Sequence, residues 1–528
     1  MDFSLSSSLV GSAVSNPDKL ALDLQFAADK TLTARKGPTP AFTRGSRATF
    51  VDSDGLVRYA PNNSSLYSGQ LVIGTGWNSD TIAGITSTVD GAGPDGNNAY
   101  QITEIANTGV HAIFNTGGTG GTGATSIVSG TTYTGSIFIK KVAGSVDWIQ
   151  LSFAGAGFGS IQYANFNLST GAIGNSVGGT AGIEAHANGW YRVSWTAVAT
   201  ATTTTASNLI TLFTNNTNSS VRAVSYAGNT ANKALAAMCQ FEIGSTVNTY
   251  NPTTTAAFQG PRFDHDPVTL ACKGLLIEES RTNVALYSGA IVNNIGWGGT
   301  ITSSVSGTGP DGSSSYQLSE TAILGLQSIA NTGSTGSAQS TSIVSGTTYT
   351  GSIFVKKVAG NIDWIQITFG GAGFGAVQYA NFNIGNGTVG NSAGLASGTV
   401  PRIEAYGDGW YRLSMAATAT ATIATNNVII GFIQNTNGTT RLPSYVGSTA
   451  NKVLAAMGQF ETGSFPTSYI PTTTSSVIRS ADVCSISGSA FSGFYNTPEG
   501  TLFAIASTLS TNLSIRRIFS MTDGTSAN

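Results

Sequence analysis

The sequence predicts an all-β protein made of tandem β-sandwich modules of the jelly-roll type. Three observations predict this fold class: a long internal repeat, short runs of β-branched and aromatic residues, and turn signals rich in Gly, Asn and Asp between those runs. No long window shows the period and caps of a helix. With 9% charged and 40% hydrophobic residues, the 528-residue chain has the composition of a packed protein and not of a disordered one.

The repeat fixes the positions of the two modules. SIVSGTTYTGSIFIKKVAG begins at Ser126, and it returns almost unchanged at Ser342, 216 positions later. GPDG, QYANFN and GWYR recur in the same order, and the closing AAMCQFE returns as AAMGQFE. We place copy 1 near residues 64–256 and copy 2 near residues 284–475.

Each copy shows the alternation of β-strands. In TYTGSIFIK, Tyr133, Ile137 and Ile139 share one face of a strand, and Phe138 lies on the other. GPDG, and the Asn-Gly that precedes WYRVSW, predict turns between strands. Many short strands in a module of this length are typical of a sandwich or jelly roll. Upstream of copy 1, ATFVDSDGLVRYA predicts a hairpin that turns at 52–55.

Composition excludes several classes of function. A net charge of -2 argues against a nucleic-acid-binding surface, which is basic. No apolar run reaches the roughly 18 residues that a membrane span needs, and the N-terminus lacks the cationic start of a signal peptide. The three cysteines, Cys239, Cys272 and Cys484, lack metal-ligand spacing, so we expect free thiols and folding in a reducing cytoplasm.

The histidines do not predict a catalytic centre. His111 and His186 align with Gln327 and Tyr406 of copy 2, so the shared module is built without either histidine. His265 stands in Asp-His-Asp, and a polar turn before the next proline explains it better than a metal site, because further ligands are not evident. We therefore expect a protein that is not an enzyme.

Acidic residues recur at four aligned positions, which are Glu104/Glu320, Asp147/Asp363, Glu184/Glu404 and Glu242/Glu461. A glycosidase needs two carboxylates that face one another across a cleft, and the sequence leaves open whether any two of these converge. Glu184 lies eight positions before Arg192, which favours a cross-strand ion pair over catalysis.

Sugar binding needs aromatic faces beside amides that fix the orientation of the ring. Most recurring aromatic residues are expected in the cores. The candidate carbohydrate-binding residues have polar neighbours and flank a glycine-rich loop; they are Trp148, Gln150 and Tyr163 in copy 1, and Trp364, Gln366 and Tyr379 in copy 2. Asp95 and Asp311, in the GPDG turns, are candidate ligands of a structural calcium ion, although a type I turn explains them better. We expect no other cofactor or metal.

Four segments together resemble virion proteins of tailed bacteriophages. They are PAFTRGSRATFVDSDGLVRYAPNN, PRFDHDPVTLACKGLLIEESRTN, the paired GWYR and QFE stretches, and VIRSADVCSISG. Such proteins are usually described as tail fibres, tail proteins or head-spike fibres. In them a carbohydrate-binding-module-like sandwich commonly neighbours a laminin-G or concanavalin-A-like sandwich.

This resemblance implies a domain plan. In the relatives, ATFVDSDG often runs directly into RFDHDP, whereas here a whole module separates the two segments. We therefore expect residues 19–63 and 257–283 to form one small split β unit into which copy 1 is inserted. Residues 1–18 are expected to be an N-terminal arm. Residues 476–528 are expected to be the start of an incomplete lectin-like domain of the laminin-G or concanavalin-A type.

The resemblance also implies a function. We expect a structural component of a phage particle, a fibre, spike or decoration on the tail or head, made in the host cytoplasm and exposed on the virion surface. Its expected partners are other virion proteins, further copies of itself in a homotrimer, and host-surface glycans. Nucleic acid and membrane insertion are not expected. The alternatives are a polysaccharide depolymerase subunit and a purely structural spacer that binds no glycan.

Overall fold

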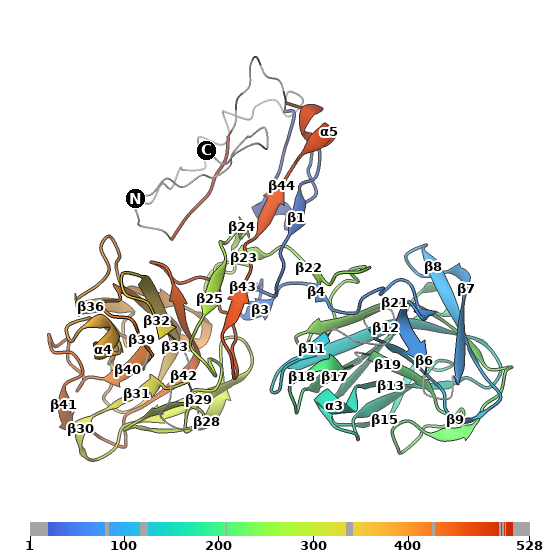
Figure 1. The fold of residues 1–528 in the computed structure, drawn as a ribbon, viewed down its shortest axis with the longest axis horizontal. Coiled ribbons are helices and arrows are strands. Elements are labelled where there is room, and N and C mark those ends of the chain that lie inside the picture. The colour runs from blue at the N-terminus through green and yellow to red at the C-terminus, as the bar shows by residue number, and fades with distance from the viewer. Residues whose placement is uncertain are drawn as a thin grey trace. The chain divides into compact units, whose positions relative to one another are not determined.

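The structure is a computed structural model that describes residues 20–79, 84–116, 125–206, 209–333, 342–424, 428–495, 498, 501 and 503–509. It divides into two compact units. Residues 59–260 form the copy-1 unit, and the residues up to 58 together with those from 261 onward form the copy-2 unit. The all-β prediction and the two β-sandwiches are confirmed (Figure 1).

The copy-1 unit contains two large sheets. Within its described residues, one sheet has seven strands in the order β15 (Ala172–Val177), β14 (Tyr163–Asn167), β13 (Trp148–Phe153), β19 (Leu209–Phe213), β10 (Ala112–Asn115), β6 (Gly76–Ser79) and β5 (Val72–Ile73). The other has six described strands in the order β16 (Thr180–Ala185), β17 (Tyr191–Val198), β12 (Thr132–Ala143), β21 (Lys233–Ile243), β8 (Asn98–Glu104) and β7 (Ile85–Ala92).

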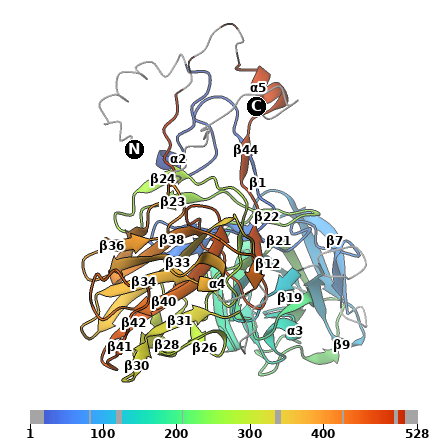
Figure 2. The same cartoon turned by 60° about the vertical axis from the view of Figure 1, so that its left-hand side comes forward.

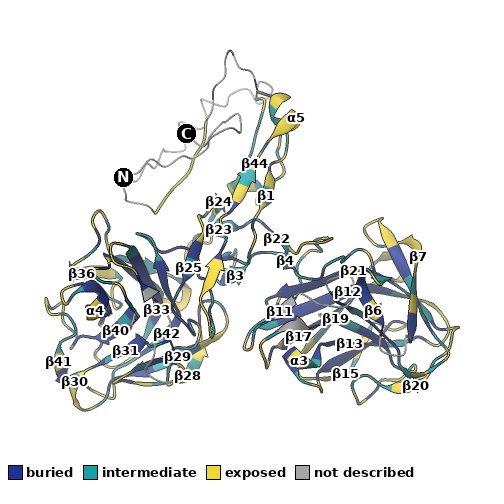
Figure 3. Ribbon diagram, viewed as in Figure 1, coloured by how far each residue is buried: buried dark blue, intermediate teal, exposed yellow. Residues whose placement is uncertain are grey.

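The main core of this unit lies between these sheets, and the predicted alternation of β12 accounts for it. Ile137 and Ile139 are fully buried there, in one cluster with Phe153 of the facing sheet. Phe138 points to the outer face of the six-stranded sheet, where it forms a second small cluster with Trp190. Figure 3 shows the buried residues concentrated on the strands of each module.

The copy-2 unit repeats this sandwich (Figure 2). In its described part, the seven-stranded sheet runs β26 (Val292–Asn293), β27 (Gly296–Gly299), β31 (Ser328–Asn331), β40 (Val428–Phe432), β34 (Trp364–Phe369), β35 (Tyr379–Asn383) and β36 (Thr388–Ala393). The facing sheet runs β28 (Thr302–Thr308), β29 (Ser314–Ser319), β42 (Lys452–Thr462), β33 (Thr348–Ala359), β38 (Trp410–Thr418) and β37 (Arg402–Ala405), and β25 (Arg281–Asn283) joins it to β43 (Val477–Arg479).

Segments from outside the repeat complete the copy-2 unit. The predicted hairpin is present as β2 (Thr49–Val51) paired with β3 (Val57–Tyr59), which ends at the boundary of the unit. The segment between the copies forms β23 (Phe263–His265) and β24 (Cys272–Leu275). The Val51 backbone N–H donates to the Asp264 carboxylate at 2.9 Å, so the hairpin and this segment lie together.

In its described part, the region after copy 2 pairs its strands with segments from earlier in the chain. Its first strand, β43, pairs with β25, and its second, β44 (Val483–Ser485), pairs with β1 (Ala41–Thr43). Only the short helix α5 (Gly488–Ser492) follows among the described elements. The expected arm at 1–18, and 510–528 of the expected lectin-like domain, lie outside the described residues.

The remaining described elements are short. The two-stranded sheets pair β4 (Asn62–Asn63) with β22 (Phe258–Gln259), β9 (Thr108–Val110) with β20 (Ser225–Ala227), β11 (Thr125–Ile127) with β18 (Thr203–Ala206), β30 (Leu324–Leu326) with β41 (Ser444–Val446), and β32 (Ser342–Ile343) with β39 (Ile423–Ala424). The helices are α2 (Phe26–Asp29), α3 (Gly155–Phe158), α4 (Gly371–Phe374) and the 3₁₀ turns η2 (Ala187–Gly189) and η3 (Gly407–Gly409). None of the described helices has the length and apolar character that crossing a membrane requires.

Candidate functional site

The structure places the candidate carbohydrate-binding residues of copy 1 on β13 and β14, but two of the three are internal. The Gln150 side chain is fully buried; it donates to the Asn165 amide oxygen at 2.9 Å and accepts from the Ala223 backbone N–H at 2.8 Å. Tyr163 is 3% exposed, and its hydroxyl lies 3.4 Å from the Ser219 carbonyl. Both side chains therefore hold the loop after β19 instead of facing solvent.

Copy 2 repeats this arrangement. Gln366 is fully buried and donates to the Asn381 amide oxygen at 2.8 Å, and Tyr379 is 5% exposed. Trp148 and Trp364 are half-buried, each close to a glycine of the edge strand of its sheet, Gly174 on β15 and Gly390 on β36. The six residues are thus brought together on one sheet of each copy, but four of them are buried, so they do not form an open platform for a sugar ring.

The candidate calcium ligands close their own turns. Asp95 accepts from the Asn97 backbone N–H at 3.1 Å, and Asp311 accepts from the Ser313 backbone N–H at 3.0 Å. The Gly96 N–H to Gly93 carbonyl bond, at 3.0 Å, completes the first turn. A search of the described residues finds no group of three or more His, Cys, Asp or Glu side chains placed to hold a metal ion.

The recurring buried carboxylates act as internal braces. Glu104 accepts from the Tyr226 hydroxyl and, at 2.9 Å, from the Asn232 amide. Burial raises the pKa of Glu242, which accepts from the Asn248 amide at 2.6 Å. Copy 2 preserves both arrangements around the equivalent residues, which are Glu320 and Glu461.

The outer face of the β12 sheet differs between the two copies. In copy 2 the equivalent face, carried by β33 and β38, is covered by the β2–β3 hairpin. Val57 of this hairpin is 7% exposed and packs with Phe354 and Trp410. Its backbone N–H donates to the Pro310 carbonyl at 2.9 Å, which fixes the hairpin against the GPDG turn.

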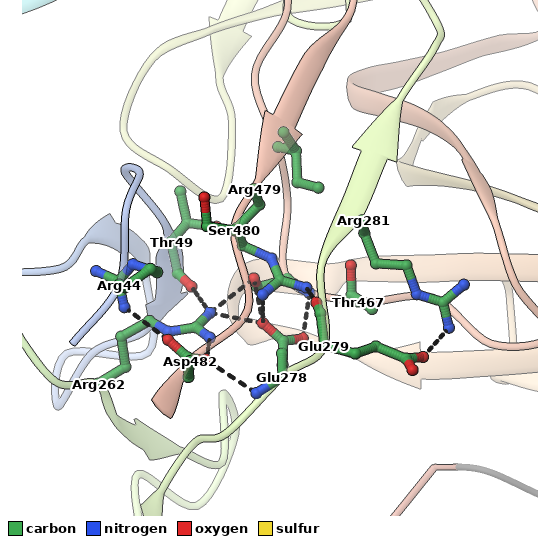
Figure 4. Close-up of polar contacts among 12 residues, drawn as sticks. Arg44, Thr49, Arg262, Glu278, Glu279, Arg281, Thr467, Arg479, Ser480 and Asp482 are labelled. Carbon is green, nitrogen blue, oxygen red and sulfur yellow. Dashed lines mark hydrogen bonds and ion pairs between the residues drawn. The ribbon is translucent and has the colours of Figure 1, made fainter. Parts of the chain in front are cut away.

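A buried ion cluster holds that hairpin in place (Figure 4). Arg262 is fully buried and donates to the Thr49 carbonyl at 2.8 Å and to the Glu278 carboxylate at 2.6 Å. Its other terminal nitrogen pairs with Asp482, which also binds Arg44 at 3.0 Å. The cluster therefore joins the hairpin, the segment between the copies and the segment after copy 2.

Electrostatics keep Glu278 charged in this cluster. Burial alone would raise its pKa, but Arg262 and Arg479, together with hydrogen bonds from Ser468, outweigh burial and lower the pKa to about 2. The sequence analysis missed this cluster. The available signal was that arginines and acids gather in the flanking segments FTR, RFDHDP, IEESR and IRSAD of a chain that is poor in charge.

In copy 1 the corresponding place is a recess of about 580 Å³, lined by Ala92, Gly93, Pro94, Lys140, His186, Ala187, Asn188 and Trp190. Pro94 and Trp190 align with Pro310 and Trp410, the residues that contact Val57 in copy 2. The recess therefore corresponds to the space that the hairpin fills in the other module.

The charge of the recess also differs from that of copy 2. In copy 2 Lys356 binds the Asp408 carboxylate at 2.7 Å. In copy 1 Asn188 stands where copy 2 has Asp408, and both residues adopt left-handed φ angles of 61° and 58°. Lys140 forms no ion pair with any residue that the structure describes.

His186 forms one wall of the recess. Its ring packs on Phe138 with a centroid distance of 4.9 Å, as Tyr406 packs on Phe354 in copy 2. Its Nε2 lies 3.6 Å from the exposed Glu184 carboxylate and has no hydrogen-bond partner in the described part of the chain. This Nε2 atom is itself buried, so it is not exposed to a ligand in the recess.

Glu184 and Arg192 lie opposite one another as expected, but the structure does not show the expected ion pair between them. The two residues are directly opposite on β16 and β17. Arg192, however, donates to the Asn248 carbonyl at 2.6 Å and to the Ser136 hydroxyl at 3.1 Å, and the ion-pair contact of Glu184 is with His186. The Arg192 guanidinium therefore holds the loop after β21 through its hydrogen bond to the Asn248 carbonyl.

Comparison with known proteins identifies no family. No family model matches the chain, and no curated protein matches it. Among solved structures, the tandem CBM22-1–CBM22-2 domain of Paenibacillus barcinonensis Xyn10C is 12% identical over 76% of this chain and 98% of its own, with a TM-score of 0.21. The CBM22-1 and GH10 modules of Clostridium thermocellum xylanase 10B, complexed with xylohexaose, are 16% identical over 36% and 30%, with a TM-score of 0.21. TM-scores of this size are too low to support a statement about the function of this chain.

Proposed function

We propose that this chain is a non-enzymatic structural component of a tailed-phage particle, in which copy 2 is a fixed structural module and copy 1 is a displayed glycan-binding module. The observation that carries this proposal is the difference between the two equivalent sheet faces. The face of copy 2 is covered by Val57 and its hairpin, whereas the face of copy 1 has a recess within its own unit.

The copy-2 unit has the properties of a structural support. Its flanking segments are joined to one another by buried ion pairs, and breaking such a cluster is costly because it leaves uncompensated charge inside the protein. The resemblance of these same segments to phage virion proteins supports a role on the particle. Homotrimer formation belongs to this proposal by analogy with phage fibres.

The recess of copy 1 has the composition of a sugar site. Trp190 lines it but is only 4% exposed, so the exposed Ala92 and Pro94 supply the apolar surface, and Lys140, His186 and Asn188 supply polar groups around it. Ligand sites commonly combine an apolar wall with a few polar groups that fix orientation. Because we assign binding to copy 1 alone, avidity would come from the several chains on one particle and not from two sites on each chain.

The depolymerase alternative has less support. Glycoside hydrolysis needs a pair of carboxylates across a cleft. Among the described residues, the recurring buried pairs Glu104/Glu320 and Glu242/Glu461 are committed to tyrosine, asparagine or threonine partners inside the modules. Absence of reducing-end release from host polysaccharide would agree with this assignment, and its presence would contradict it.

A glycan array probed with the intact chain tests the binding part of the proposal. Ala187 is exposed at the rim of the recess, so Ala187→Trp is expected to block binding without disturbing the core. Ala172→Trp, on the exposed edge strand of the other sheet, is the matched control and should bind like the parent chain. Equal binding by both variants would contradict the site.

Purified phage particles test the structural part. Mass spectrometry of particles should detect the chain, and gold-labelled antibodies should place it on their surface. Particles purified to homogeneity that lack the chain would refute the virion role, and analytical ultracentrifugation of the isolated chain tests the trimer.

A further inference from the structure

We infer that the recess of copy 1 binds a sugar that carries a carboxylate, an inference that rests on the glycan-binding role proposed above. The starting point is the aligned lysine pair. A methyl group in place of the Gly189 side-chain hydrogen would lie 3.8 Å from Lys140 Cε, and one at Gly409 would lie 3.9 Å from Lys356 Cε. Both lysines therefore occupy the same place in their modules.

The partner of this lysine differs between the copies. A carboxylate, from Asp408, lies 2.7 Å from Lys356 Nζ in copy 2. The aligned Asn188 of copy 1 carries a neutral amide, which cannot balance the charge of Lys140. The recess of copy 1 therefore presents an ammonium group at the position where copy 2 has an internal ion pair.

The surrounding charges leave that ammonium group available. Glu184, the acid beside His186, has a side chain that is 69% exposed and lies 3.6 Å from the His186 ring. Asp95, in the turn that lines the recess, accepts hydrogen bonds from both the backbone and the side chain of Asn97. Neither acid is within 4.0 Å of Lys140, so a carboxylate supplied by a ligand would meet an unpaired cation.

The other walls favour a sugar over a simple ion. Ala92 and Pro94 provide exposed apolar surface against which a sugar ring can lie, and Asn188 provides an amide that both donates and accepts hydrogen bonds. A charge-assisted hydrogen bond from Lys140 to a carboxylate would be the strongest single contact in this set.

Asn188→Asp is the most direct test, because it gives copy 1 the ion pair of copy 2. An Asp already occupies the same left-handed conformation at position 408, with φ 58° against 61° for Asn188, so the variant should fold normally. The probes are oligogalacturonate, its fully methyl-esterified form, and a sugar phosphate, titrated calorimetrically against the intact chain. We expect the acid to bind at least tenfold more tightly than the ester, and Asn188→Asp to remove that preference.

Asp408→Asn in copy 2 is the matched control. It frees Lys356 in the module whose recess is filled by Val57, so the affinity for oligogalacturonate should stay unchanged. Lys140→Met should weaken binding of the acid as much as Asn188→Asp does, and it should leave binding of the ester unaffected.

Several outcomes would overturn the inference. Equal affinity for acid and ester, unaffected by Asn188→Asp, would leave glycan binding in place but refute recognition of a carboxylate. Binding of the sugar phosphate without the acid would assign a different anion to the site. A doubling of mass that Ala187→Trp abolishes would show that a second copy of the chain occupies the recess. An empty glycan array together with silent titrations would refute the proposed function as well.

Discussion

The same sheet face is covered by a hairpin in copy 2 and borders a recess in copy 1. In copy 2 it is covered by a hairpin that carries Val57, and its lysine is neutralised by Asp408. In copy 1 the aligned residues line a recess, and the lysine faces an asparagine. What a repeated module does is therefore decided by the segments packed on it and by a few substitutions at its rim.

The largest expected effect comes from breaking the ion cluster that holds the hairpin on copy 2. Arg262→Met would leave Asp482 and Glu278 buried without their shared partner. Removing one member of a buried ion pair typically costs about 3–5 kcal/mol, so the free energy of unfolding of the copy-2 unit should fall by that amount. Urea titration with pulse proteolysis and mass spectrometry would report the two units separately.

The copy-1 unit contains no member of this cluster, so its unfolding should not change in Arg262→Met. Arg35→Ala is the control within the copy-2 unit, because Arg35 forms an exposed pair with Asp29. That variant should unfold like the parent chain. A loss of stability spread over both units would show that the cluster does not act locally.

The second prediction concerns the stability of the copy-2 unit at low pH. The pKa of Glu278 is about 2 in the folded chain against 4.5 for the free group, a difference that corresponds to about 3 kcal/mol. A lowered carboxyl pKa stabilises the fold fully above pH 4.5, and this stabilisation is lost as the pH falls from 4.5 towards 2. Pepsin cleavage across that range should therefore show the copy-2 unit opening before the copy-1 unit.

The buried acids that both copies share do not make the copy-2 unit open before the copy-1 unit as the pH falls. Burial raises the pKa of Glu242 and of Glu461, so each contributes more stability as the pH falls, and one lies in each module. Glu278→Gln should lower the free energy of unfolding of the copy-2 unit at pH 7. Near pH 2 the variant and the parent chain should have the same free energy of unfolding. If the difference in free energy of unfolding between variant and parent were the same at every pH, the charge of Glu278 would not be its cause.

The third prediction removes the side chain that fills the recess of copy 2. Val57→Ala deletes two methyl groups that pack on Trp410 and Phe354, which should cost about 1–2 kcal/mol of unfolding free energy in the copy-2 unit. Val305→Ala, at a side chain that is 65% exposed, is the matched control and should have no measurable effect. Equal losses in the two variants would show that Val57 does not fill a cavity.

The sequence was sufficient for the fold because the repeat and the period-two alternation are local signals. Tyr133, Ile137 and Ile139 were expected on one face, and all three are buried in the main core. Alternation does not reveal what covers the second face of a strand. Phe138 and Phe354 occupy the same position in the repeat, yet only Phe354 has a hairpin of distant sequence packed over it.

The site was harder to predict, because polar side chains beside aromatic residues suit an internal brace as well as a ligand. Gln150 and Tyr163 satisfy backbone groups of a loop more than 50 residues away, and no local pattern shows such a contact. The more useful signal was a difference between otherwise equal copies. NGWYR against DGWYR identifies Asn188 and Asp408, and only the structure showed which lysine each one meets.

The smallest expected effect comes from exchanging a histidine that the copies do not share. His111 is fully buried, with Nδ1 2.8 Å from the Gly84 carbonyl, and Gln327 lies at the aligned position in copy 2, where it accepts from the Thr321 N–H at 2.9 Å. Since both side chains fill the same place beside a glycine, His111→Gln should cost less than about 1 kcal/mol in the copy-1 unit. His111→Ala would remove one of the two hydrogen bonds that the Gly84 carbonyl accepts and would leave a cavity, so it should cost about 1–3 kcal/mol. If both variants lose the same stability by urea titration, the two copies are not equivalent at this position, and residues aligned in the repeat do not have interchangeable structural roles there.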